Sequence, residues 1–228
     1  MRSISNGAEI TRLDTGESWH TLWDWGLAME QGSVIGLPVV ETHYVRVPGR
    51  PGLLDYAEVL TGAPVYTERP ISMTLGGRRQ EWPEFLPRLT HKLHGRRVRL
   101  VFDDLRGYYW EGRAELSDFD RLRQLGQFTL ALPHADPYGY AVAETEVNLT
   151  AADEAAVLVK AGPAPFHVGV RVLDIPAGGQ LRVEVPGQSY GLAVGENTGF
   201  RPFVTEEDLT LTFVGSGSVC VHWREGIL

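Results

Sequence analysis

One run near residue 50 constrains the fold more than any other feature, because it interrupts a β-rich segment with two adjacent Pro-Gly pairs. The run reads Tyr44-Val45-Arg46-Val47-Pro48-Gly49-Arg50-Pro51-Gly52-Leu53-Leu54-Asp55. The two prolines preset φ near the turn value and the two glycines accept positive φ, so two tight reversals can follow one another. The run contains no nucleophilic side chain. It predicts a loop that sets the course of the backbone and takes no part in catalysis.

The composition is that of a soluble globular chain, with 43% apolar and 22% charged residues in 228. The first seven residues have no apolar core of signal-peptide length, and no run reaches the ~18 apolar residues of a membrane span. Cys220 is the only cysteine, so no internal disulfide can form. We find no Walker glycine-lysine run and no dinucleotide fingerprint, and we expect no cofactor and no membrane partner.

Charged residues are distributed unevenly along the chain. Residues 1–138 hold 16 Lys+Arg against 18 Asp+Glu, and residues 139–228 hold 5 against 11, which together give the net charge of −8. An acidic chain without a concentrated basic surface is not suited to general nucleic-acid binding. The difference in net charge between these segments predicts two domains, 1–138 and 139–228.

The chain reads as mainly β with one short helix. In the first half, strands are predicted at 38–47, 63–75, 96–102, 108–116 and 126–132, and the last three are expected to form a meander. Apolar residues at helical spacing from Trp82 to Leu93 predict a helix that ends near His94 and is kinked or late-starting because of Pro87. Residues 133–146 read as the connection between the domains.

The second half predicts a β-sandwich, because short strand candidates alternate with Gly or Pro turns at steady spacing. These candidates lie near 155–160, 166–175, 180–185, 190–194, 209–214 and 218–223.

Several motifs flank the Pro-Gly run between residues 20 and 138. They are Trp23-Asp24-Trp25-Gly26-Leu27, Thr61-Gly62 with Tyr66 and Arg69, Leu93-His94-Gly95-Arg96-Arg97-Val98, Asp103-Asp104 with Tyr108-Tyr109, and Asp136-Pro137-Tyr138. In this order the chain resembles the distal tail protein (Dit) family of long-tailed bacteriophages and prophages.

The resemblance implies a structural virion protein, not an enzyme, made in the bacterial host cytoplasm and located at the virion tail tip. It implies an N-terminal belt domain that closes into a ring, expected to be a hexamer, and a C-terminal galectin-like sandwich. The implied partners are the tail tube protein and the tail-associated hub or receptor-binding proteins of the baseplate, and DNA passes through the lumen without specific binding. The candidate oligomerisation loop is Pro48, Gly49, Arg50, Gly52 and Leu53.

Two other functions have sequence support. Gly187-Gln188-Ser189-Tyr190-Gly191 matches a hydrolase elbow, and Asp208 and His222 follow in triad order, although the strand-like flanks of Ser189 favour a hairpin. The alternative of a carbohydrate-binding module rests on aromatic side chains that could stack on host-wall sugars, although aromatics in β-rich chains are more often core or interface residues. These are Trp19, Trp23, Trp25, Trp110 and Trp223. A metal site at His91 and His94 lacks a third ligand nearby.

Overall fold

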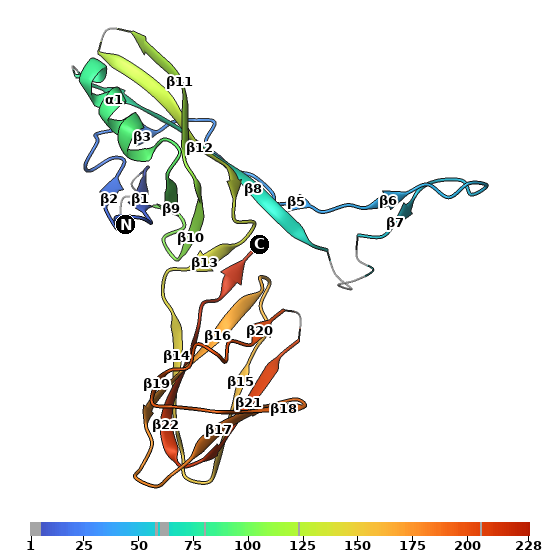
Figure 1. Cartoon of the computed structure of the whole chain (residues 1–228). Helices are drawn as coiled ribbons and strands as arrows, with labels where there is room; N and C mark the ends of the chain where they lie inside the picture. Colours follow the sequence, from blue (N-terminus) through green and yellow to red (C-terminus); the bar gives the residue numbers. More distant parts are fainter. Residues whose placement is uncertain (1–5, 58, 60–63, 80, 123, 206) are drawn as a thin grey trace. The chain divides into compact units, whose positions relative to one another are not determined.

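The computed structural model describes residues 6–57, 59, 64–79, 81–122, 124–205 and 207–228. It divides into two compact units, Met1–Gly139 and Tyr140–Leu228. The described part is mainly β with one helix, as the sequence predicted (Figure 1). In this part no helix has the length and apolar character needed to cross a membrane.

The first unit is built on two antiparallel sheets. One has the order β2-β1-β9-β10, made of β2 (Ser18–His20), β1 (Ala8–Arg12), β9 (Arg97–Phe102) and β10 (Tyr108–Arg113). The other has the order β11-β12-β8-β3, made of β11 (Glu115–Leu122), β12 (Leu125–Ala135), β8 (Tyr66–Arg78) and β3 (Ala28–Met29), with β4 (Val34–Ile35) and β5 (Val39–Val40) also on β8. Strand β8 is therefore the longest element and the centre of this sheet.

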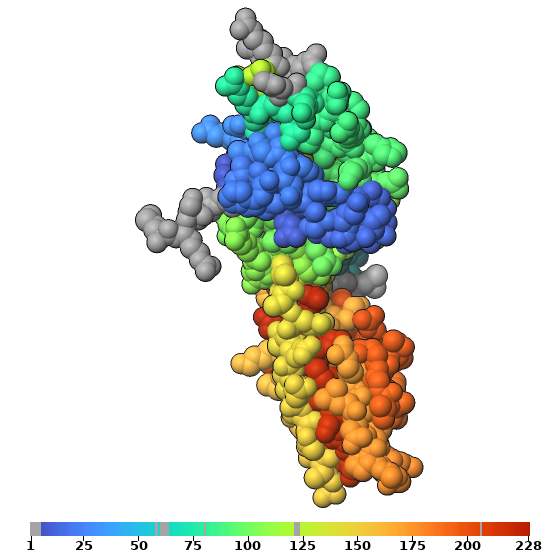
Figure 2. Space-filling model, turned by 90° about the vertical axis from the view of Figure 1, so that its left-hand side faces the viewer, coloured from blue at the N-terminus to red at the C-terminus, as the bar shows by residue number. Residues whose placement is uncertain are grey.

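Alternation along β8 and β12 explains why the second sheet has one buried face. Ile71, Met73 and Leu75 on β8 are buried, as are Phe128 and Leu130 on β12. Residues two apart on a strand point to the same face, so these side chains form one apolar layer. In the space-filling view the blue N-terminal segment lies against the green part of the same unit (Figure 2), in agreement with the pairing of β1 and β9.

Helix α1 (Trp82–Leu93) is anchored by Trp82, whose ring lies within 5.5 to 6.4 Å of the rings of Phe85, Phe119 and Phe128. Its indole N–H donates to the carbonyl of Gln124 at 3.1 Å. The helix does not start late: it begins at Trp82 and contains Pro87. Of the two alternatives expected from Pro87, a kink or a late start, the late start is wrong, because the aromatic packing of Trp82 holds the first turn. The expected end near His94 is confirmed, since the helix ends at Leu93 with His94 as its C-cap.

The predicted hairpin of β9 and β10 is confirmed, with Trp110 opposite Leu100. The predicted three-strand meander is wrong, because the strand at 126–132 pairs with β11 and β8. The chain leaves the first sheet at Ala114, which is fully buried, and continues as β11 in the second. The polar sequence of β11 gave no apolar pattern to predict it.

The second unit begins within β13 (Gly139–Ala141) and contains two sheets that share one apolar core. The first has the order β14-β22-β16-β19, made of β14 (Thr145–Ala151), β22 (Gly217–Trp223), β16 (Phe166–Asp174) and β19 (Gly195–Glu196), with β20 (Phe203–Val204) also on β16. The second has the order β15-β21-β17-β18, made of β15 (Glu154–Val159), β21 (Leu209–Gly215), β17 (Leu181–Val185) and β18 (Gln188–Gly191). The chain ends with β23 (Gly226–Ile227).

The second unit should fold by itself, because its core is formed within residues 140–228. Both ends of this segment are also tied together: Ala141 donates its N–H to the carbonyl of Glu225 at 2.8 Å, and Arg224 donates to the carbonyls of Ala141 and Val142. We expect the isolated fragment to unfold in urea in one cooperative transition. Circular dichroism during the titration measures this, and a broad transition without a folded baseline would contradict it.

Candidate assembly site

The most unusual feature of the first unit is an extended arm, which we define as the described residues 37–57 and 59. It leaves β8 through β5, where Val39 pairs with Glu68 and Val40 with Tyr66. It then forms a two-stranded ribbon of β6 (Tyr44–Val45) and β7 (Leu54–Asp55). Figure 1 shows this ribbon projecting beyond the sheets of its own unit.

The arm contributes nothing to a hydrophobic core. Every residue from Thr42 to Leu53 is exposed. Large apolar side chains are nevertheless common there and 37 to 87% exposed: Leu37, Val39, Val40, Tyr44, Val45, Val47, Leu53, Tyr56 and Val59. An isolated two-stranded ribbon is marginal in water, and contiguous exposed apolar surface marks interaction sites. The arm therefore has the composition of a segment that binds another protein surface.

The predicted loop lies at the tip of this arm, between β6 and β7. Gly49 has φ of 81° and Gly52 has φ of 82°, which confirms the backbone predicted for both residues. A Cβ at either position would meet no atom within 4 Å, so a substitution there would strain the backbone without a clash. Pro48, Arg50 and Leu53 are exposed beside them.

The arm also carries charge close to its root. The Glu41 carboxylate contacts the His43 ring at 2.8 Å, and the Asp55 carboxylate accepts the backbone N–H of Ala57 at 2.9 Å. Arg46 and Arg50 are exposed in the loop region. A partner surface would thus meet apolar side chains together with carboxylates and guanidinium groups.

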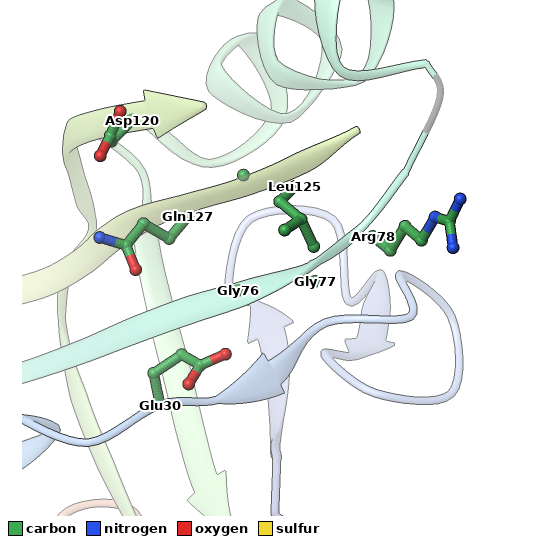
Figure 3. Close-up of a pocket in the computed structure, with 8 residues that line it drawn as sticks. Glu30, Gly76, Gly77, Arg78, Asp120, Leu125 and Gln127 are labelled. Atoms are coloured by element: carbon green, nitrogen blue, oxygen red, sulfur yellow. The ribbon is translucent and has the colours of Figure 1, made fainter. Parts of the chain in front are cut away.

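An open hollow of about 310 Å³ lies elsewhere on the first unit, over the glycine-rich end of β8 (Figure 3). It is lined by Glu30, Gly76, Gly77, Arg78, Asp120, Leu125, Gly126 and Gln127. Gly76 leaves this space open, because a Cβ there would come within 2.8 Å of the Glu30 carboxylate. The hollow is lined by the carboxylates of Glu30 and Asp120 and contains no serine, cysteine, lysine or histidine, and Arg78 already donates to the side chain of Gln124.

The structure does not assemble the hydrolase triad that the sequence suggested. Ser189 lies on β18, in a hairpin with β17. His222 lies on β22 in the other sheet, and its two ring nitrogens contact Glu144 at 3.1 Å and Glu196 at 2.8 Å. Asp208 accepts the backbone N–H of Ala161. Asp208 and His222 are thus engaged in separate contacts, and Ser189 is a hairpin residue.

The remaining motifs have structural roles. His91 lies in the last turn of α1, and the ring of His94 accepts the backbone N–H of Leu116 at 3.1 Å. No group of three metal-ligating side chains occurs among the described residues. Of the five tryptophans proposed as sugar platforms, Trp25, Trp110 and Trp223 are buried.

Replacing Ser189 with alanine should change neither stability nor any hydrolytic activity. Its side chain is exposed and lacks a histidine partner, and such surface substitutions change stability by about 0.5 kcal/mol or less. Urea titrations and chromogenic ester assays of the wild type and the variant check this. An ester hydrolysis that the variant loses would refute the structural assignment of Ser189.

Comparison with solved structures finds the Dit protein (gp 19.1) of SPP1, described as a paradigm of the hub adsorption apparatus in phages that infect Gram-positive bacteria. The two chains are 13% identical and superpose with a TM-score of 0.66, covering 97% of this chain and 99% of that chain. No protein-family model matches the sequence, and no curated protein sequence matches it. At this identity the similarity shows the fold: over nearly its whole length the chain has a β-rich, Dit-like fold.

Proposed function

We propose that this chain is a structural protein of a phage tail, the subunit of a ring of the distal tail class in the adsorption apparatus. The observation that carries the proposal is the Dit-like fold over nearly the full length of both chains. The ring would be a hexamer that joins the tail tube protein above to the tail-associated hub and receptor-binding proteins below. The protein would be made in the host cytoplasm and act at the virion tail tip.

The arm supports this proposal physically. A ribbon whose residues from Thr42 to Leu53 are all exposed cannot be held by the core of its own chain. The exposed apolar side chains of the arm would be removed from water if the arm lay on the next copy in a ring. Each copy would then give one arm and receive another, which is the head-to-tail contact that closes a cyclic oligomer.

The two units would have different roles in the ring. We assign assembly to the first unit, which carries the arm, and we assign the second to a galectin-like sandwich on the outside of the ring. A lumen formed by the first unit would let DNA pass without binding it, since residues 1–138 hold 16 Lys+Arg against 18 Asp+Glu and so carry no net positive charge. Sugar binding by the second unit remains the alternative function, but of the five tryptophans only Trp23, at 70% exposed, is widely open to solvent, and it belongs to the first unit.

The purified protein should form closed rings. Multi-angle light scattering over a range of concentrations should give a mass approaching six chains, and electron microscopy should show the rings directly. A monomer–ring equilibrium that depends on concentration is consistent with the proposal. A monodisperse monomer at high concentration would contradict it.

The double substitution Gly49→Val, Gly52→Val should weaken the ring while leaving both units folded. A β-carbon in the left-handed region costs about 1–2 kcal/mol per residue, so the loop that shapes the tip of the arm would change conformation. Light scattering measures assembly and circular dichroism measures folding.

A matched control exists in the second unit. Gly178 and Gly187 have φ of 78° and 79°, and a Cβ at either would also meet no atom within 4 Å. Gly178→Val, Gly187→Val introduces the same backbone strain away from the arm and should leave assembly unchanged. If the arm variant assembles as well as this control, the loop is an ordinary surface turn.

A further inference from the structure

Arg69 is a buried cation without a counter-charge. It lies on β8 and only 5% of the residue is exposed. In the part of the chain that the structure describes, its side chain has no ion pair, and Nε is buried without a hydrogen-bond acceptor. Burial lowers the pKa of Arg69, and no neighbouring charge or hydrogen bond opposes that shift.

Two other arginines on strands of the same unit have carboxylate partners. Arg99 contacts the Glu111 carboxylate at 2.7 Å and Arg12 contacts Asp14 at 2.6 Å. Buried charges in proteins are almost always paired, because taking a charge out of water is costly and only a partner compensates for it. Arg69 therefore calls for a partner that the described part of this chain does not supply.

Two carboxylates close to Arg69 in the sheet are engaged elsewhere: Glu68 precedes it on β8, and Asp136 follows Ala135, which pairs with Arg69. Glu68 contacts the ring of His134, and as the adjacent strand residue it points to the opposite face from Arg69. Asp136 accepts the backbone N–H of Tyr138 at 3.1 Å. Burial raises the pKa of Asp136 and Arg97 opposes this, with no contribution from Arg69.

The position of Arg69 connects it to the arm. Glu68 and Tyr66, just before it, pair with β5 at the root of the arm. Pro70, just after it, lies where the register of β12 on β8 shifts between Leu132 and Ala135. Arg69 is thus at the boundary between the core part of β8 and the part that holds the arm.

We propose that Arg69 receives a carboxylate from a second copy of this chain when the arm of that copy binds. This inference rests on the proposed ring and names one of its contacts. The described arm offers two carboxylates, Glu41 and Asp55, and each makes its contact within the arm through one oxygen only, Oε1 with the His43 ring and Oδ1 with the Ala57 N–H, so the second oxygen can accept from Arg69. A guanidinium and a carboxylate form charge-assisted, often bidentate hydrogen bonds, which would compensate the buried charge only in the assembled state.

Arg69→Met tests the proposal, because it should have opposite effects on the isolated chain and on the assembly. Methionine keeps the apolar stem and removes the uncompensated charge, so the monomer should unfold at a higher urea concentration. Assembly should weaken by about 30-fold or more, because the incoming carboxylate loses its partner. Urea titration at monomeric concentrations and light scattering measure the two effects.

Arg99→Met is the matched control for stability. Arg99 has a partner in its own chain, so its removal leaves Glu111 with less compensation and should lower the urea midpoint. Asp55→Asn and Glu41→Gln, each combined with Arg69→Met, identify the carboxylate. With the true partner already replaced, Arg69→Met should have little further effect on assembly.

The outcomes separate this inference from the proposed function. If the wild type assembles and Arg69→Met assembles equally well, the Arg69 contact is wrong and the ring stands. An Arg69→Met monomer that is less stable than the wild type, or full additivity with both arm variants, also overturns the contact. A wild type that never assembles overturns both.

Discussion

The pairing of β8 with its neighbours is the interaction on which the first unit depends. Along one edge β8 pairs with β12, from Leu125 opposite Arg78 to Ala135 opposite Arg69. Along the other edge it pairs in turn with β3, β4 and β5. One strand thus holds the apolar layer at one end and the root of the arm at the other, so core packing fixes the direction in which the arm leaves.

Pro70 separates these two functions of β8. Proline cannot donate a ladder hydrogen bond, and within sheets it is confined to edges and bulges. The β12 register shifts beside Pro70, and on the other edge the N–H of Gly36 donates to the Pro70 carbonyl at 2.8 Å between the β4 and β5 pairings. A Cβ on Gly36 would lie 2.7 Å from that carbonyl oxygen, so glycine permits the close approach that starts the arm.

The sequence allowed much of the β framework to be predicted, because most strands alternate between apolar and polar residues. In the second unit β15, β16, β17, β21 and β22 were anticipated in this way, as was the hairpin of β9 and β10, whereas the two-residue strands β19 and β20 were not. Strand β1 was missed because it is short and follows an unpatterned terminus, and its burial comes from pairing with β9, distant in sequence. The arm could be predicted only as a turn, because local sequence indicates a reversal and not how far it projects from a core.

The sequence pattern also indicates that Arg69 is buried, although an arginine by itself suggests a solvent-exposed position. An arginine in a strand usually indicates a solvated face, yet positions 69, 71, 73 and 75 share one face, and the last three are buried apolar residues. Period-two alternation therefore places a charge on the core side, and only the structure shows that no carboxylate among the described residues comes to meet it. Such a conflict between local pattern and burial is costly for an isolated chain, and natural sequences retain conflicts of this kind mainly at functional sites. The arm and Arg69 are two such conflicts. The arm is an exposed apolar surface that its own unit does not cover, and Arg69 is a buried charge without a carboxylate partner among the described residues. A second copy that covers the arm and supplies a carboxylate to Arg69 would remove both conflicts in one interface.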